Sequence, residues 1–135
     1  MGFAESLRTC FGKYAKFDGR ASRPEFWYFY LFCFIYMFVA GFLLGMTGAS
    51  DAASGGAILI LMIPIFIPSI AVAARRLHDI NQSGWMQCIF IPGFFGDMLL
   101  GTGYVIYIVT LALWAFWFSQ VGKKGKNRFG AQPKK

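Results

Sequence analysis

Long apolar runs separated by short polar segments are the main pattern of the chain. A helix needs about 20 mainly apolar residues to cross the ~30 Å hydrocarbon core of a bilayer. The pattern therefore predicts an all-α integral membrane protein, a four-helix bundle with four spans. The spans are expected at about 26–46, 57–74, 85–100 and 103–119.

Prolines and glycines refine this pattern in the second half of the chain. Pro64 and Pro68 are expected to kink the second span. A single helix over 85–118 would be ~51 Å long at ~1.5 Å per residue. Since Pro92 and Gly93 interrupt this stretch, two short helices in a hairpin fit a bilayer better. Asp97 then falls near the outer surface, where an interfacial loop acid is the expected role and a functional intramembrane acid the alternative.

The segment before the first span, residues 1–25, is basic and amphipathic. Apolar side chains recur at helical spacing over residues 3–17, with basic side chains between them. We expect a short helix in the headgroup layer; the alternative is a helix packed on the rest of the protein. Ser22 and Glu25 have the S-x-x-E spacing of a capping box, which predicts the start of the first span.

Composition supports a membrane protein and restricts the chemistry. Hydrophobic residues make up 57% of the 135-residue chain and charged residues 14%, against about 25% charged in soluble domains. One domain, 1–135, is expected. The three cysteines are scattered and there is one histidine, so we expect neither a disulfide framework nor a metal site nor a cofactor.

The basic residues predict the orientation in the membrane. Of the 13, five precede the first span, two lie between the second and third, and six lie in the tail, 120–135. By the positive-inside rule both termini are cytoplasmic. The net charge of +7 would attract anionic lipid at about 1 kcal/mol per basic side chain close to the surface. No nucleic-acid-binding module is evident, and no nucleic acid partner is expected.

The stretch "ARRLHDINQSGW", residues 74–85, holds the most varied polar groups. If the second helix continues past the membrane, Asp79 is three residues from Arg76 and four from Arg75, and both spacings allow an ion pair. His78 is adjacent to Asp79, so the two side chains point about 100° apart and cannot form a relay with each other. Anchor and turn roles explain most of the segment, and enzyme chemistry is not expected.

Two interpretations of the polar segments remain open. In the first they form structural ion pairs that hold the segments together, with Glu25, Asp79 and His78 as participants. In the second, arginine side chains bind a lipid phosphate or an acidic partner, because the guanidinium group suits phosphates and carboxylates. The residues proposed for binding are Arg20, Arg23, Arg75, Arg76 and Arg128.

Three polar motifs resemble one known family. They are "FDGRASRPEFW" at 17–27, "ARRLHDINQSGW" at 74–85 and "GKKGKNRFGAQP" at 122–133. In this order they are similar to the family catalogued as domain of unknown function 805, the YhaH/YhaI-like bacterial inner-membrane proteins. Asn81 stands where glycine is common in that pattern, and the tail is unusually rich in lysine. The resemblance implies a small multi-pass protein of the bacterial cytoplasmic membrane and supplies no reaction or ligand.

The leading hypothesis is a non-enzymatic membrane protein whose arginine-rich cytoplasmic face binds anionic lipid or an acidic protein partner. One alternative is a small transporter or channel component that uses the kinked second span and Asp97. Another is a lipid-modifying enzyme that uses His78 with Asp79 or Ser83. Gly41 and Gly45 form a G-x-x-x-G pair, which suits packing within the bundle or a homo-oligomer.

Overall fold

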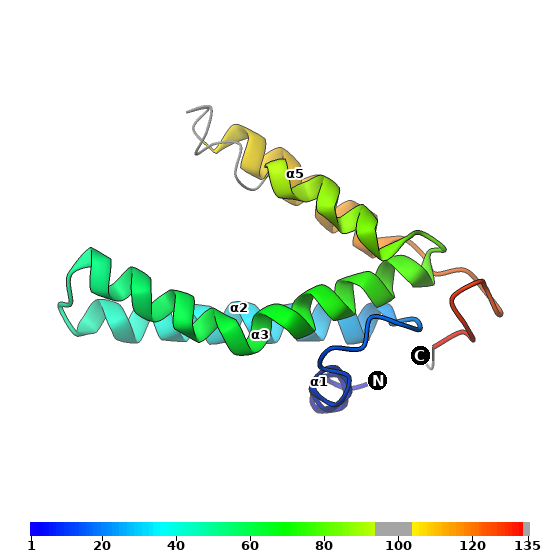
Figure 1. Cartoon of the computed structure of the whole chain (residues 1–135), viewed down its shortest axis with the longest axis horizontal. Coiled ribbons are helices and arrows are strands. Elements are labelled where there is room, and N and C mark those ends of the chain that lie inside the picture. The colour runs from blue at the N-terminus through cyan, green and yellow to red at the C-terminus, as the bar shows by residue number, and fades with distance from the viewer. Residues whose placement is uncertain (94–103, 134–135) are drawn as a thin grey trace. The chain divides into compact units, whose positions relative to one another are not determined.

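The computed structural model describes residues 1–93 and 104–133 (Figure 1). Across these residues the fold is all-helical and contains no strand, as the apolar pattern predicted. The chain divides into two compact units, one of Met1–Lys16 with Pro24–Val72, the other of Phe17–Arg23 with the described residues from 73 onward. The elements are α1 (Phe3–Gly12), α2 (Arg23–Met46), α3 (Asp51–Asp79), the 3₁₀-helix η1 (Gly84–Phe90) and α5 (Val105–Ser119).

Two of these helices are long and apolar enough to cross a membrane. α2 has 24 residues and α3 has 29, and their most apolar windows have mean hydropathies of 2.2 and 2.6. At ~1.5 Å per residue they measure ~36 Å and ~44 Å. α5 is apolar but shorter, with 15 residues or ~22 Å. The four-helix bundle therefore stays a prediction.

The observed helices differ most from the expected spans at the second and third spans. α3 extends beyond 57–74 at both ends and runs through Pro64 and Pro68, so "ARRLHD" lies on the helix. The expected third span starts as the 3₁₀-helix η1 rather than as an α-helix. Its second half, including Asp97, lies outside the described residues.

The N-terminal helix is shorter than the sequence pattern indicated. α1 ends at Gly12, and Lys13 has non-helical backbone angles. Within the first unit α1 packs on the start of α2, where the Phe11 ring lies 5.6 Å from that of Phe29 and 5.8 Å from that of Phe32. This is the packed arrangement that was the alternative expectation; a place for α1 in the headgroup layer stays a prediction.

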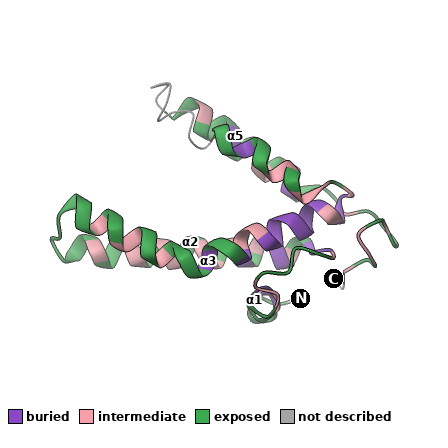
Figure 2. Cartoon of the chain, in the orientation of Figure 1, coloured by how far each residue is buried: buried purple, intermediate pink, exposed green. Residues whose placement is uncertain are grey.

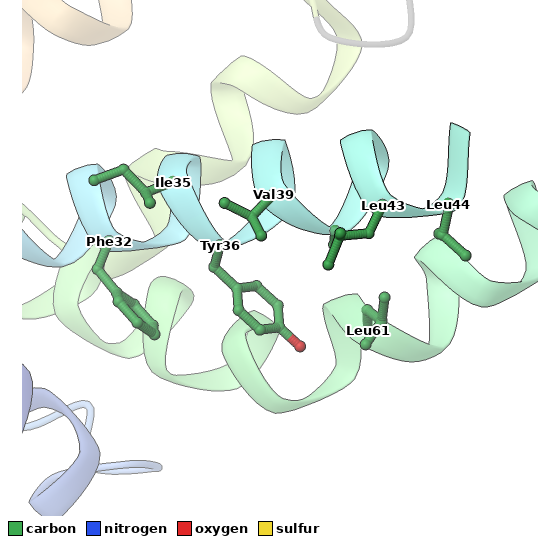
Figure 3. A pocket seen from close by; sticks show the side chains of 8 residues that line it. Phe32, Ile35, Tyr36, Val39, Leu43, Leu44 and Leu61 are labelled. Carbon is green, nitrogen blue, oxygen red and sulfur yellow. The ribbon is translucent and has the colours of Figure 1, made fainter. Parts of the chain in front are cut away.

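α2 and α3 form the apolar part of the first unit. The Tyr30 hydroxyl donates to the Ser69 carbonyl at 3.3 Å, and the Ser69 hydroxyl donates to the Ile65 carbonyl at 2.6 Å. These polar contacts lie beside Pro68, where a helix lacks one backbone hydrogen bond. Further along, an apolar groove of about 480 Å³ is lined by α2 side chains from Phe32 to Leu44 and by Leu61 of α3 (Figure 3).

Buried residues of α3 concentrate toward its C-terminal end (Figure 2). In the second unit this end meets η1 closely, because a Cβ added to Gly84 would stand 2.9 Å from the Ala74 Cβ. The α5 side chain Phe118 is fully buried, and its ring lies 6.4 Å from that of Phe90 in η1. The polar motifs of the sequence meet at this end of α3.

Candidate functional site

The end of α3 is shaped by a Schellman turn, in which a residue after the helix takes the left-handed conformation. Asn81 has φ 64°, its amide donates to the His78 carbonyl at 3.0 Å, and the Gln82 amide donates to the Leu77 carbonyl at 2.9 Å. Glycine fits this position best and asparagine is the usual second choice. Asn81 therefore suits this left-handed position.

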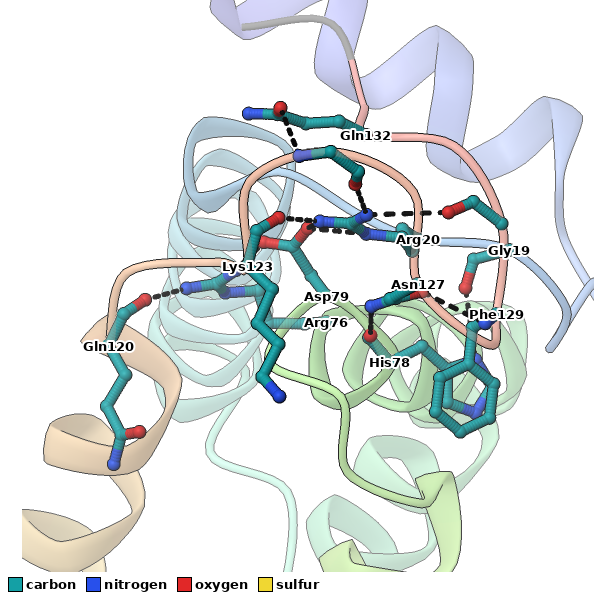
Figure 4. A network of polar contacts seen from close by, with 12 residues as sticks. Gly19, Arg20, Arg76, His78, Asp79, Gln120, Lys123, Asn127, Phe129 and Gln132 are labelled. Atoms are coloured by element: carbon teal, nitrogen blue, oxygen red, sulfur yellow. Dashed lines mark hydrogen bonds and ion pairs between the residues drawn. The ribbon is translucent and has the colours of Figure 1, made fainter.

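Asp79 lies at the centre of the site and binds two arginines (Figure 4). Arg20 approaches from the segment before α2, with Nη2 2.8 Å and Nε 2.9 Å from Asp79 Oδ1. Arg76, one turn before Asp79 on α3, pairs with Oδ2 through Nη1. All three residues are buried. Each carboxylate oxygen thus holds one guanidinium group.

The remaining donors of Arg20 reach backbone carbonyls of the tail. Nη1 donates to the Gly125 carbonyl at 2.5 Å and to the Gly130 carbonyl at 3.4 Å, and Nη2 donates to the Lys123 carbonyl. A planar guanidinium with several fixed donors can satisfy such converging acceptors, which an ammonium group matches less well. Arg20 therefore orders the loop of residues 122–130, called here the basic loop.

Arg76 caps the C-terminal end of α5. Its Nε donates to the Phe118 carbonyl at 3.0 Å and its Nη2 donates to the Gln120 carbonyl. The last carbonyls of a helix lack partners within the helix and carry partial negative charge. The Arg76 guanidinium supplies hydrogen bonds to these carbonyls and a positive charge beside them, and it links α5 to α3. We call Arg20, Arg76, Asp79 and the carbonyls they bind the Asp79 cluster.

Backbone and amide groups complete the connection between three distant segments. The Lys123 amide donates to the Asp79 carbonyl at 2.9 Å, and Asn127 Nδ2 donates to the His78 carbonyl at 2.8 Å. From the segment before α2, the Ala21 amide donates to the Arg75 carbonyl at 2.9 Å. The C-terminal carbonyls of α3 are thus capped by segments about 50 residues away on either side.

His78 takes part in packing at this site. Its Nδ1 lies 3.0 Å from the Gly19 carbonyl, so this nitrogen carries the proton that is shared with the carbonyl. The ring stacks on Phe129 with 3.9 Å between centroids and 6° between planes. The Arg128 guanidinium lies 4.6 Å from the centre of the same Phe129 ring. Ser83 accepts the amide of Trp85 and caps η1.

The sequence-predicted residues fall into two groups by exposure. Arg23 and Arg128 are exposed, whereas Arg20, Arg75 and Arg76 are buried, the last two with only 1% of their surface accessible. In the first unit Glu25 is also buried, and its Oε1 lies 3.9 Å from the sulfur of Cys10. The second unit brings together Arg20, Arg76, Asp79 and His78, although no ion pair of His78 occurs among the residues described.

Sequence reasoning named Asp79 but missed the backbone groups that bind the arginines. The acceptors are carbonyls of ordinary loop residues, for which no side-chain pattern exists. The glycines of the tail were the one signal in the sequence. The structure explains Gly122, because a Cβ at this position would overlap the Asp79 carboxylate. It also explains Gly125 and Gly130, because both have a positive φ, which favours glycine. Within residues 1–93 and 104–133, no group of three or more His, Cys, Asp or Glu side chains is placed to hold a metal ion.

Known proteins are similar to this chain over most of its length. The family described as "Protein of unknown function (DUF805)" matches residues 14–131, which include the first two polar motifs and the third as far as residue 131. Inner membrane protein YhaH of Escherichia coli strain K12 is 38% identical over 122 residues, covering 90% of this chain and 89% of the relative. Inner membrane protein YhaI of the same strain is 31% identical over 122 residues, covering 90% and 88%. No solved structure matches the chain. The chain belongs to the DUF805 family.

Proposed function

We propose that this protein is a non-enzymatic, multi-pass protein of the bacterial inner membrane whose exposed basic residues bind anionic lipid. In this proposal both termini are cytoplasmic and four spans form the bundle that the sequence predicts. The relatives YhaH and YhaI are named inner membrane proteins, which supports a location in the inner membrane. The two long apolar helices and the confinement of the basic residues to three segments support the multi-pass arrangement.

The observation that carries the proposal is the division of labour among the basic residues. Arg20 and Arg76 direct their donors to Asp79 and to backbone carbonyls, which leaves them poorly placed to bind a phosphate. Five other basic residues are exposed instead: Arg23, Lys123, Lys124, Lys126 and Arg128. The buried arginines thus build the structure, and the exposed cations remain for anionic headgroups at about 1 kcal/mol each near the surface.

Native mass spectrometry of the protein extracted with its surrounding lipids tests the proposal. We expect bound phosphatidylglycerol or another anionic lipid on the released protein. On exchange into defined lipids, phosphatidylglycerol should be retained in preference to phosphatidylcholine, and the preference should weaken in high salt. Equal retention of the two lipids would contradict the proposal, and so would discrete binding of a second protein in place of lipid.

A further inference from the structure

The basic loop carries a dense group of exposed cations on an ordered backbone. Between residues 122 and 130 the chain has four basic side chains, and it has no acidic residue after Asp97. The four side chains are exposed, whereas the loop is attached to the buried Asp79 cluster. They are Lys123, Lys124, Lys126 and Arg128.

Hydrogen bonds fix the loop at both ends and in the middle. The Lys123 amide binds the Asp79 carbonyl, Arg20 binds the Gly125 carbonyl, and Arg128 Nη2 donates to the Asn81 carbonyl at 3.3 Å. Within the loop, the amides and carbonyls of Asn127 and Gly130 bind each other at 3.0 and 3.1 Å. The Asn127 side chain also accepts the amide of Phe129 at 2.9 Å.

This attachment matters because surface electrostatics act over short distances. A flexible tail lets its charges move about 5–6 Å × √n away after n residues. The attraction of anionic lipid falls off over about 8–10 Å at moderate salt. A loop bonded to the last turn of α3 keeps its cations together, beside the point where the apolar helix gives way to polar residues. An ordered loop also loses less conformational entropy on binding lipid than a flexible tail does.

From this arrangement we propose that the basic loop is the anionic-lipid-binding surface of the protein and that Arg20 is its positioning residue. This inference rests on the proposed function and names its site. The occupant is the phosphate headgroup of phosphatidylglycerol or another anionic lipid, bound by Lys123, Lys124, Lys126 and Arg128. Arg20 contributes through the loop backbone without touching the lipid.

Two matched triple variants of the full chain test where the lipid binds. Lys123→Gln with Lys124→Gln and Lys126→Gln removes three charges from the loop. Arg8→Gln with Lys13→Gln and Lys16→Gln removes three charges from the N-terminal segment. Each protein is titrated with phosphatidylglycerol and with phosphatidylcholine and examined by native mass spectrometry. We expect the preference for phosphatidylglycerol to fall about a hundredfold in the loop variant and less than about twofold in the control.

The outcomes separate the inference from the proposed function. If the unmodified protein has no preference for phosphatidylglycerol, the proposed function is wrong. If the preference exists and both triple variants weaken it equally, lipid binding follows total charge and the inference is overturned. Retention of an acidic protein rather than lipid by the loop would overturn it as well.

Arg20→Lys tests the positioning role, because it keeps the charge and loses the planar fork. We expect the lipid preference to fall several-fold and amide hydrogen exchange in residues 122–130 to accelerate. If Arg20→Lys does not fold, Asn127→Ala tests whether lipid binding depends on an ordered loop, because it removes only the side-chain bonds of Asn127 with His78 and Phe129. An unchanged lipid preference with a loosened loop, in either variant, would contradict the positioning role.

Discussion

The α2–α3 pair of the first unit and the Asp79 cluster of the second distribute apolar and charged groups in opposite ways. On α2 the phenylalanines Phe34 and Phe38 expose 68% and 66% of their surface. In the cluster, by contrast, Arg76 is 1% exposed. A protein in water would favour the reverse arrangement. This distribution is the one expected for helices surrounded by lipid, with specific internal contacts concentrated at the C-terminal end of α3.

The two regions also differ in what holds them together. Only 6% of the most apolar window of α2 is buried within the chain, so little packing specificity resides there. In the Asp79 cluster, hydrogen bonds of charged side chains instead join Arg20 to Asp79, 59 positions away, and Arg76 to the Phe118 carbonyl, 42 positions away. Removal of one partner from a buried ion pair lowers the stability of the protein far more than substitution of an exposed side chain does. Substitutions in the two regions should therefore have very different effects.

The largest effect is expected for Asp79→Asn. This change leaves two buried guanidinium groups without their carboxylate, which costs about 3–5 kcal/mol. Asp51→Asn at the exposed start of α3 is the matched control and should stay within about 0.5 kcal/mol. Denaturation in detergent followed by circular dichroism measures both. Equal stability of the two variants would contradict a structural role for the cluster.

A smaller effect is expected for Gly122→Ala. The added methyl group meets the Asp79 carboxylate, and we expect a loss of about 1–3 kcal/mol through displacement of the ion pairs. Gly41→Ala is the control, because a Cβ there meets nothing within 4 Å and alanine is the better helix former. The control should be neutral or slightly stabilising in the same denaturation experiment. A neutral Gly122→Ala would mean that the tail does not approach Asp79.

Substitutions at Asn81 test the turn that positions the tail. Asn81→Ala places a side chain that tolerates positive φ poorly, and we expect a loss of about 1 kcal/mol. Asn81→Gly should be neutral or stabilising for the same reason. The comparison of these two variants by thermal unfolding separates backbone conformation from loss of the side chain. A better tolerance of alanine than of glycine would argue against the left-handed conformation.

The smallest effect is expected on the exposed face of α2. Phe38→Leu exchanges one apolar side chain for another where few chain contacts exist, so the stability should change by less than about 0.5 kcal/mol. Phe26→Leu, at a fully buried position, is the control and should cost about 1 kcal/mol or more. Equal costs at the two positions would indicate that the exposed face of α2 packs against protein rather than lipid.

The sequence predicted the features that depend on local pattern. The first span, at about 26–46, corresponds closely to α2, and α3 does run on through Arg76 and Asp79 as the ion-pair spacing required. Ion pairs of Asp79 between the segments were one of the two interpretations, but Arg20 as the specific distant partner was not predictable, because no periodicity links residues so far apart. The carbonyl partners were also hidden, since every residue has a carbonyl group. The length of α1 was overestimated, because the apolar spacing continues past Gly12, where the helix ends.

The central claim is that Arg20 and Asp79 are partners in a buried structural cluster. A double-mutant cycle with Arg20→Ala, Asp79→Ala and the double variant tests it most directly, with unfolding free energies measured in detergent. We predict a coupling free energy of about 1.5–3 kcal/mol between the two side chains. A coupling below about 0.5 kcal/mol would contradict the account, because the two residues would then contribute independently.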